Sequence, residues 1–166
     1  MKTFCLAKMI VVFLLIFTNG IQAQTTQTNL NQVELMSQLI GKWQATVGQD
    51  TNNIWEVKPF GRALIITNYN VIKGIAAEPN INSIGYDDRD DKLKGFIIDY
   101  NADFLTWIGR FTAYNILKVD AVDTFKPEIV WWKNELEFVT PTDMIFRGFN
   151  AEGVKTVEWN YKIVKE

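Results

Sequence analysis

Apolar and polar residues alternate with a period of two along most of the chain, from Gly41 to the C-terminus. The clearest run covers residues 156–164, in which every second side chain is large and apolar: Val157, Trp159, Tyr161 and Ile163. Further runs lie at residues 42–47, 54–57, 63–71, 82–87, 92–100, 104–112, 115–123, 128–133, 136–140 and 143–149. A period of two predicts β-strands with one apolar face.

The breaks between these runs are short and rich in Gly, Asn and Asp, as in "GQDTNN", "DDRDD" and "NAEGVK". Short breaks of this composition predict consecutive antiparallel hairpins. We therefore expect an all-β fold of about ten strands, without parallel βαβ units. An open sheet of that width would leave bare edges, so we favour a single up-and-down antiparallel barrel over a two-sheet sandwich.

One short helix is expected before the first strand. Asn31 fits the N-cap position and Glu34 fits N3, where both side chains can satisfy free amide groups. Val33, Met36 and Ile40 recur at helical spacing, with Leu39 beside them, and Gly41 follows as a left-handed stop. An amphipathic helix at this position can plug one end of a barrel.

The N-terminus has the pattern of a secretory signal peptide over residues 1–23. Lys2 and Lys8 precede the apolar stretch Met9–Phe17, and a cleavage site follows at Ala23. Residues 24–30 are polar and are expected to form a disordered tether before a domain at residues 31–166. We expect the mature chain in the periplasm or outside the cell, without a stable membrane span. The absence of N-glycosylation sequons favours a bacterial envelope.

Composition excludes several chemistries. The chain has no His, and its single Cys is Cys5, within the signal peptide. The mature chain therefore has no means of forming a Ser-His-Asp or Cys-His nucleophile, or a conventional zinc site. The formal net charge of −2 gives no basic footprint for nucleic acid. We expect no metal and no cofactor, and the sequence singles out no catalytic residue.

Three stretches resemble a known superfamily. Gly41-Lys42-Trp43 after a short helix is similar to the G-x-W signature of the calycins, which include lipocalins and fatty-acid-binding proteins. "GYDDRDDKLKGFIID" (residues 85–99) with "TWIGRF" downstream, and "MIFRGFNAEG" with "VEWNYKIVK", resemble hairpins of uncharacterised bacterial lipocalin-like domains. The resemblance implies that Trp43 packs across the closed end of the barrel beneath an Arg from a late strand. Arg147 is the best candidate, although it precedes the final strand.

Six tryptophans suggest a cavity as well as a core. Large aromatic side chains either fill a small barrel or line a cavity that holds a flat or hydrophobic guest. Adjacent Trp131 and Trp132 must face opposite sides of their strand. Arg110 either faces the cavity, where it would bind a ligand anion, or lies in solvent on the face opposite Trp107. The ligand-binding candidates are Trp55, Tyr69, Trp107, Arg110 and Trp132.

Acidic residues are weaker candidates. The cluster Asp87, Asp88, Asp90 and Asp91 invites a calcium site, but the EF-hand pattern requires a Gly where Lys92 stands and an acidic residue where Ile98 stands. We expect a solvated turn there. Glu56 and Asp99 would have raised pKa values, suited to acid catalysis, only if they pointed into an apolar interior. Outward placement is favoured.

Three functions remain open from the sequence alone. The first is an exported barrel that binds a small hydrophobic or aromatic molecule. The second is an envelope interaction or scaffold protein with no small ligand, which exposed aromatic residues such as Trp131 would favour. The third is a cofactor-free enzyme that uses a buried carboxylate, Tyr or Arg. The oligomeric state does not follow from the sequence.

Overall fold

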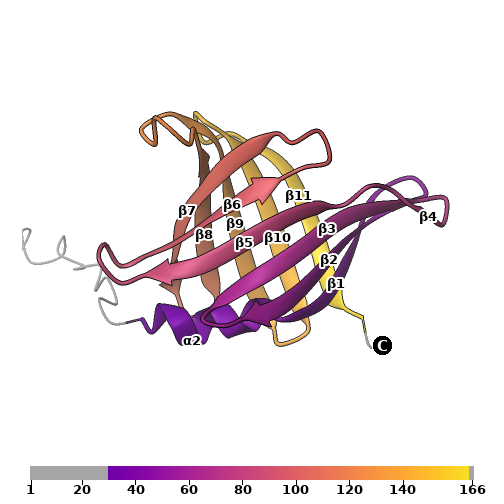
Figure 1. The fold of residues 1–166 in the computed structure, drawn as a ribbon. Helices are drawn as coiled ribbons and strands as arrows, with labels where there is room; N and C mark the ends of the chain where they lie inside the picture. The colour runs from indigo at the N-terminus through magenta and orange to yellow at the C-terminus, as the bar shows by residue number, and fades with distance from the viewer. Residues whose placement is uncertain (1–29, 165–166) are drawn as a thin grey trace, which may run out of the picture.

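The chain forms a closed antiparallel β-barrel with one short helix at its base (Figure 1). The structure, a computed structural model, describes residues 30–164. The predicted signal peptide and nearly all of the predicted tether lie outside the described residues. Leu30, the last tether position, packs in the core with 9% of its surface exposed. The all-β barrel expected from the sequence is confirmed.

Eleven strands pair in one sheet, and ten of them close the barrel. Neighbours in sequence are neighbours in the sheet, β1 pairs with β11, and β2 with β3, so the ring has no open side. The two-residue β4 pairs only with the end of β3. The strands are β1 (Gly41–Gly48), β2 (Thr51–Phe60), β3 (Ala63–Ile72), β4 (Ile75–Ala76), β5 (Asn80–Asp87), β6 (Lys92–Ile98), β7 (Phe104–Ala113), β8 (Ile116–Val122), β9 (Val130–Thr140), β10 (Asp143–Asn150) and β11 (Lys155–Ile163).

One predicted break is wrong. The runs 128–133 and 136–140 were expected as two strands, but they belong to the single strand β9. Asn134 and Glu135 continue the ladder, opposite Val119 and Lys118 of β8. Neither residue forces a turn, and alternation persists because Asn134 takes an inward position and Glu135 an outward one. The sequence predicted a break at these two residues because both are polar, although Asn134 points inward.

The helix forms at the expected place and is capped as expected. It consists of α2 (Gln32–Met36) followed by a 3-10 turn (Ser37–Leu39). The Glu34 amide donates to Asn31 Oδ1 at 3.2 Å, and Asn31 Nδ2 donates to the Glu34 carboxylate at 3.2 Å. Met36 and Leu39 are buried, whereas Val33 and Ile40 are 38% exposed. The buried face is therefore formed by Gln32, Met36 and Leu39, and the prediction that Val33 and Ile40 belong to it is wrong.

Gly41 does not stop the helix but begins β1. The chain leaves the 3-10 turn through Ile40, which is extended, and Gly41 follows with φ of 136°. A side chain at this φ would be strained, and a Cβ there would lie 3.3 Å from Ile163 Cδ1. Glycine thus allows the sharp change of direction from the helix into the barrel wall.

Trp43 closes the base of the barrel. Its side chain is fully buried, and its indole nitrogen donates to the Leu39 carbonyl at 2.8 Å. Its ring meets Phe138 edge-on, with centroids 6.2 Å apart, and Phe138 stacks on Phe111. The hydrogen bond ties the first strand to the helix that lies beneath it. The hydrogen bond to Leu39 and the ring contact with Phe138 together hold Trp43 at the base.

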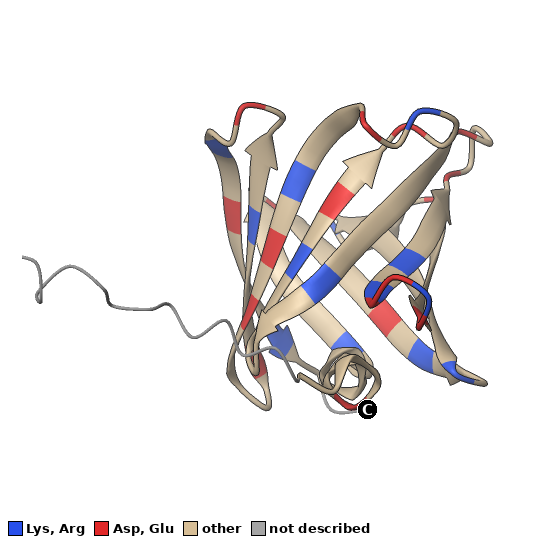
Figure 2. Cartoon of the chain, turned by 90° about the vertical axis from the view of Figure 1, so that its left-hand side faces the viewer, with Lys and Arg blue, Asp and Glu red and all other residues tan. Residues whose placement is uncertain are grey.

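Arg147 does not cover Trp43. Phe146 points into the barrel, so Arg147 beside it points outward, where it pairs with Glu135 at 3.0 Å and Glu158 at 3.1 Å. Glu137 lies 2.8 Å away, and the hydrogen bond that Arg147 donates to Glu137 is the main cause of the raised pKa of Arg147. Charged residues occur at intervals along the strands (Figure 2). Arg147 thus connects β9, β10 and β11 on the outer face of the barrel and does not seal the base.

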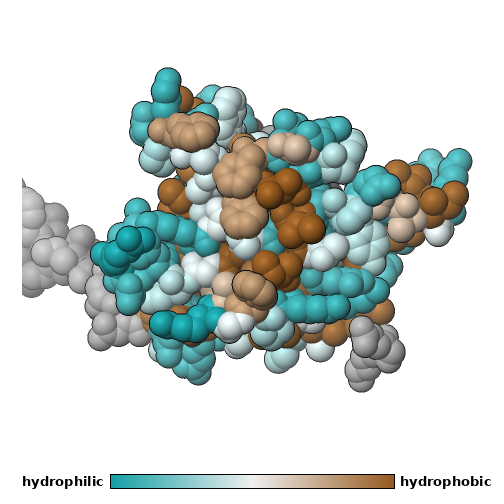
Figure 3. Space-filling model, viewed as in Figure 1, coloured by the Kyte–Doolittle hydropathy of each residue, from teal (hydrophilic) through white to brown (hydrophobic). Residues whose placement is uncertain are grey.

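The outer face of β5, β6 and β7 carries an apolar cluster. Ile81, Ile98 and Phe104 are cross-strand neighbours in register, and each is between 42% and 50% exposed. Phe96 stacks on Phe104 with ring centroids 5.6 Å apart. Figure 3 shows apolar surface near the middle of this face. Trp131, the aromatic expected in an outer patch, belongs to β9 and lies outside this cluster.

Gln32 fastens the helix to the barrel wall. Its side chain is 2% exposed; Nε2 donates to the Phe111 carbonyl at 3.1 Å, and Oε1 accepts from the Phe111 amide at 2.7 Å. Both backbone groups of one β7 residue are therefore satisfied by the plug. Within residues 30–164, no helix is long and apolar enough to cross a membrane.

We expect Gln32→Met to lower the free energy of unfolding by about 2–4 kcal/mol, because it leaves two buried backbone groups without partners. Gln38→Met is the matched control: Gln38 lies in an exposed setting and makes one hydrogen bond, to the Tyr114 carbonyl. We expect that substitution to cost less than about 1 kcal/mol. Urea unfolding followed by circular dichroism measures both. Equal losses in the two variants would show that the Gln32 anchor does not hold the plug.

Candidate ligand-binding cavity

The barrel encloses a cavity of about 520 Å³. Leu39, from the turn that follows α2, and Leu117 and Leu136 from the wall contribute apolar surface to it. Trp132, 37% exposed, and exposed Asn70 also line it, so the cavity communicates with solvent. This volume is typical of sites for small molecules.

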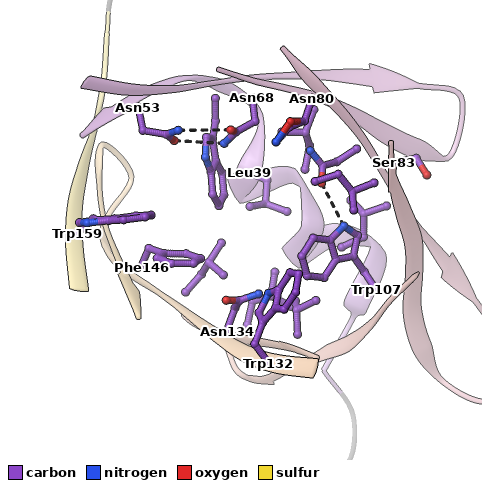
Figure 4. A pocket seen from close by; sticks show the side chains of 18 of the residues that line it. Leu39, Asn53, Asn68, Asn80, Ser83, Trp107, Trp132, Asn134, Phe146 and Trp159 are labelled. Carbon is purple, nitrogen blue, oxygen red and sulfur yellow. Dashed lines mark hydrogen bonds between the residues drawn. The ribbon is translucent and has the colours of Figure 1, made fainter. Parts of the chain in front are cut away.

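Aromatic side chains line one side of the cavity (Figure 4). They are Trp107 on β7, Trp132 on β9, Phe146 on β10 and Trp159 on β11, a group that we call the aromatic wall. Trp107 and Trp132 meet edge-to-face with centroids 5.9 Å apart. Phe146 and Trp159 stack at 5.4 Å with their planes 15° apart. These contacts hold the rings in place before any ligand enters.

Asparagines line the other side (Figure 4). Five of them come from three neighbouring strands and form what we call the asparagine wall: Asn53 on β2, Asn68 and Asn70 on β3, and Asn80 and Asn82 on β5. Asn53 pairs in register with Asn70, and Asn68 with Asn80. A sixth, Asn134, lies between Phe146 and Trp132 on the aromatic side. Asparagine is depleted in strands, so its repeated use here is unusual.

Asn53 is the centre of a buried hydrogen-bond network. Its Nδ2 donates to Asn70 Oδ1 at 2.8 Å and to Asn68 Oδ1 at 3.3 Å. Its Oδ1 accepts from the Tyr161 hydroxyl at 2.7 Å and from Asn68 Nδ2 at 3.2 Å. Burial raises the pKa of Tyr161 above its ordinary value, so its hydroxyl stays protonated as the donor. The network fixes this part of the asparagine wall.

Other amide groups in the cavity have no protein partner among the described residues. Asn82 accepts from Trp107 Nε1 at 3.1 Å, but its own Nδ2 makes no hydrogen bond within that part of the chain. The amides of Asn80 and Asn134 make none at all there, and these side chains are only partly buried. An amide offers two donor hydrogens and one acceptor oxygen. The cavity is therefore polar along one side and has free hydrogen-bonding capacity.

Charge is absent from the described lining of the cavity, which includes no Asp, Glu, Lys or Arg. Glu56 lies on the outside, where Lys42 is 2.8 Å away and Tyr69 donates at 2.9 Å. These hydrogen bonds, Lys42 first, lower the pKa of Glu56. Asp99 accepts from the amides of a surface turn. Neither carboxylate is a general acid inside the barrel.

Three of the four aspartates in residues 87–91, namely Asp87, Asp90 and Asp91, form ion pairs with neighbouring cations. Hydrogen bonds from Arg89 and then Lys94 lower the pKa of Asp87, and Lys94 also lies 2.8 Å from Asp90. Asp91 pairs with Arg110 at 3.2 Å. Across residues 30–164, no group of three or more acidic, His or Cys side chains is placed to hold a metal ion. The segment is the hairpin turn between β5 and β6.

The predicted ligand-binding residues divide into two groups. Trp55, Trp107 and Trp132 line the cavity. Tyr69 and Arg110 do not: Tyr69 bonds to Glu56 outside, and Arg110 reaches Asp91 at the surface, the solvent placement left open by the sequence. Trp55 packs on Tyr161 with centroids 5.0 Å apart, and its buried indole nitrogen has no hydrogen-bond partner in the described chain.

Sequence reasoning did not single out the asparagines. A usable signal exists, because Asn recurs with a period of two within predicted strands, in "NYN" and "NIN". Polar residues at that period were assigned to the outer face by default. In β3 the default is reversed: Asn68 and Asn70 point inward and Tyr69 outward.

Ionisation of Tyr161 gives a test of the buried network. Because burial raises its pKa, the stability that Tyr161 confers is complete below about pH 10, the ordinary value, and is lost as the pH rises through the raised value. We expect the free energy of unfolding to fall with pH more steeply in the wild type than in Tyr161→Phe. Urea unfolding between about pH 9 and about pH 11 measures this. Parallel curves would contradict the buried position of the hydroxyl.

Comparisons with known proteins do not indicate a function, so the functional argument rests on the geometry of the cavity. No protein-family model matches the chain, and no curated protein matches it.

Proposed function

We propose that this protein is an exported calycin-like barrel that binds a small uncharged molecule in its interior. The observation that carries the proposal is the cavity of about 520 Å³ beside a preformed aromatic wall. Rings already packed against one another lose little freedom when a ligand arrives, so contact with them contributes to affinity.

The calycin assignment is supported at the base of the barrel. Trp43 follows Gly41 in the first strand, is fully buried and bonds to the helix below it. This is the place that the resemblance assigns to the tryptophan. The outward Arg147 departs from the pattern, and the Leu39 carbonyl and Phe138 take the positions around the indole.

Export is supported by the N-terminal sequence. Two lysines precede an apolar stretch too short to span a bilayer, and Ala23 ends a segment suited to cleavage. The proposed site of action is the periplasm or the exterior of the cell.

An enzyme is disfavoured by the lining. General acid–base chemistry requires a titratable group within reach of the substrate. The part of the cavity that the structure describes offers amides, indoles, the Phe146 ring, aliphatic side chains and Ser83, none of which is an acid or base that titrates near neutral pH. Tyr161 has a raised pKa and already donates to Asn53, so it serves the network.

Contact with another protein is the second candidate. The cluster of Ile81, Phe96, Ile98 and Phe104 favours it, because apolar residues in register across three strands form a continuous exposed surface. This surface lies on the outside of the barrel and is compatible with an occupied cavity.

Adjacent tryptophans on β9 provide a matched test of ligand binding. N-phenyl-1-naphthylamine is an uncharged aromatic probe that accepts energy from tryptophan. We expect saturable binding to the wild type and about five-fold weaker binding to Trp132→Phe, which loses part of the aromatic wall. Trp131→Phe is the control, since Trp131 alternates with Trp132 and points outward. Fluorescence titration measures both. Absence of saturable binding, or equal weakening in both variants, would contradict the proposal.

Export predicts a defined mature N-terminus. We expect mass spectrometry of the protein purified from its cellular source to find Gln24 as the first residue, because cleavage follows Ala23. Recovery of an intact chain that retains residues 1–23 in a soluble fraction would overturn the proposed export and leave the cavity argument untouched.

A further inference from the structure

We propose that the ligand is an uncharged carbohydrate or glycoside, whose hydroxyl groups bind the free amides while a ring face packs on the aromatic wall. The inference rests on the proposed function and specifies the chemical class of its ligand. It starts from the division of one cavity into two chemically different sides, with asparagines facing indoles (Figure 4).

The free amides are the first argument. Asn80 and Asn134 come from different sides of the barrel, and neither makes a hydrogen bond to another described residue. Asn82 accepts one hydrogen bond from Trp107 and keeps both of its donor hydrogens free among the described residues. Asn53, by contrast, is saturated by its neighbours, so it supports the wall and is not counted as a ligand contact.

These amides disfavour a hydrocarbon ligand. In the empty cavity the free amides can bind water, because its partly exposed lining admits solvent. A purely apolar guest would displace that water without replacing its hydrogen bonds, and the amides that the guest covers would then be unpaired. A guest with hydroxyl groups replaces the lost bonds. The asparagine wall therefore selects for polar groups on one side of the ligand.

The arrangement of the amides favours hydroxyl groups over the edge of a flat heterocycle. Asn68 on β3 and Asn80 on β5 are cross-strand neighbours, and Asn82 lies two residues farther along β5. The amides thus cover a surface, whereas a heterocycle presents one line of donors and acceptors in fixed order. Each hydroxyl both donates and accepts, so it can pair with either end of an amide. A sugar ring carries such groups around its whole rim.

The aromatic wall leads to the same class. Enclosing a flat aromatic ligand on both faces would require two parallel rings with a gap between them. The parallel pair here, Phe146 and Trp159, is closed at 5.4 Å, and Trp107 meets Trp132 at 72°. Trp55, which lines the cavity from β2, meets Phe146 at 78° and so forms no parallel partner for the stacked pair. The rings therefore do not enclose a guest on both faces. A sugar fits this arrangement, because its C–H groups form an apolar face and its hydroxyls point elsewhere.

The lining also indicates that the buried part of the ligand carries no charge. No Asp, Glu, Lys or Arg contributes to the described lining, so an ion inside would lose its hydration without gaining a counter-charge. A neutral sugar is therefore favoured over a sugar phosphate or a sugar acid.

A matched pair of ligands tests the inference. 4-Nitrophenyl glycosides of glucose, galactose, mannose and N-acetylglucosamine are compared with 4-nitrophenyl cyclohexyl ether, which has a six-membered ring but no hydroxyl groups. We expect at least one glycoside to bind the full chain about ten-fold more tightly than the ether, because its hydroxyls pair with the free amides. Isothermal titration calorimetry measures both affinities.

Substitutions locate the selectivity. We expect Asn80→Leu and Asn134→Leu each to abolish the preference for the glycoside and to bind the ether at least as tightly as the wild type. Asn160→Leu is the control, because Asn160 is exposed on the outer side of β11 and does not line the cavity. Circular dichroism and binding of N-phenyl-1-naphthylamine verify that each variant remains folded with an accessible cavity.

The outcomes separate this inference from the function on which it rests. If the ether or the naphthylamine binds and no glycoside in the set binds more tightly than the ether, the carbohydrate class is wrong and the binding cavity stands. If no probe binds, the proposed function falls as well. If a glycoside binds but Asn80→Leu, Asn134→Leu and Asn160→Leu all retain its preference, the site lies elsewhere on the molecule and the inference is overturned.

Discussion

The closed ladder of antiparallel backbone hydrogen bonds is the constraint on which the rest of this structure depends. Because β2 pairs with β3 and β1 with β11, each of the ten strands that close the barrel has two neighbours, and successive side chains must point alternately inward and outward. The hydrogen bond from Trp43 to the Leu39 carbonyl joins that ring to its plug. The interior is therefore a space closed at its base, and every second residue of each strand faces into it.

What fills those inward positions decides the chemistry. Large apolar residues fill the base, where Trp43, Phe111 and Phe138 pack together. Farther along the strands, β2, β3 and β5 contribute five asparagines to the lining, together with Trp55, Ile66 and Ile84, while β7, β9, β10 and β11 supply the aromatic wall. Charge is kept on the outside, as the pairing of Arg147 with Glu135 illustrates. The result is a cavity with two chemically different sides and an uncharged described lining.

Periodicity predicted the strands of the barrel and the helix because both depend on apolar residues meeting a core, whereas the position of Trp43 was implied by the resemblance to calycins. It could not assign the inward face of β3, since Ile65 and Ile66 are adjacent and make both faces apolar. The ordinary preference then places Tyr69 inside and Asn68 outside, the reverse of what the structure shows. The role predicted for Arg147 was wrong for a related reason. The resemblance identified the residue, but the alternation of side chains along β10 decides whether it points inward or outward. A cavity lined by polar residues reverses the usual pattern of apolar residues inside and polar residues outside, so that pattern does not predict it.

Side-chain amide resonances test the central claim most directly. With the asparagine NH₂ signals assigned by ¹⁵N NMR, titration with the best-binding 4-nitrophenyl glycoside should shift those of Asn80, Asn82 and Asn134. Asn160, which is exposed on the outer side of the barrel, should keep its signals unchanged. Shifts confined to outer asparagines, or a bound glycoside that leaves the inner amides unmoved, would contradict an asparagine wall that recognises the ligand.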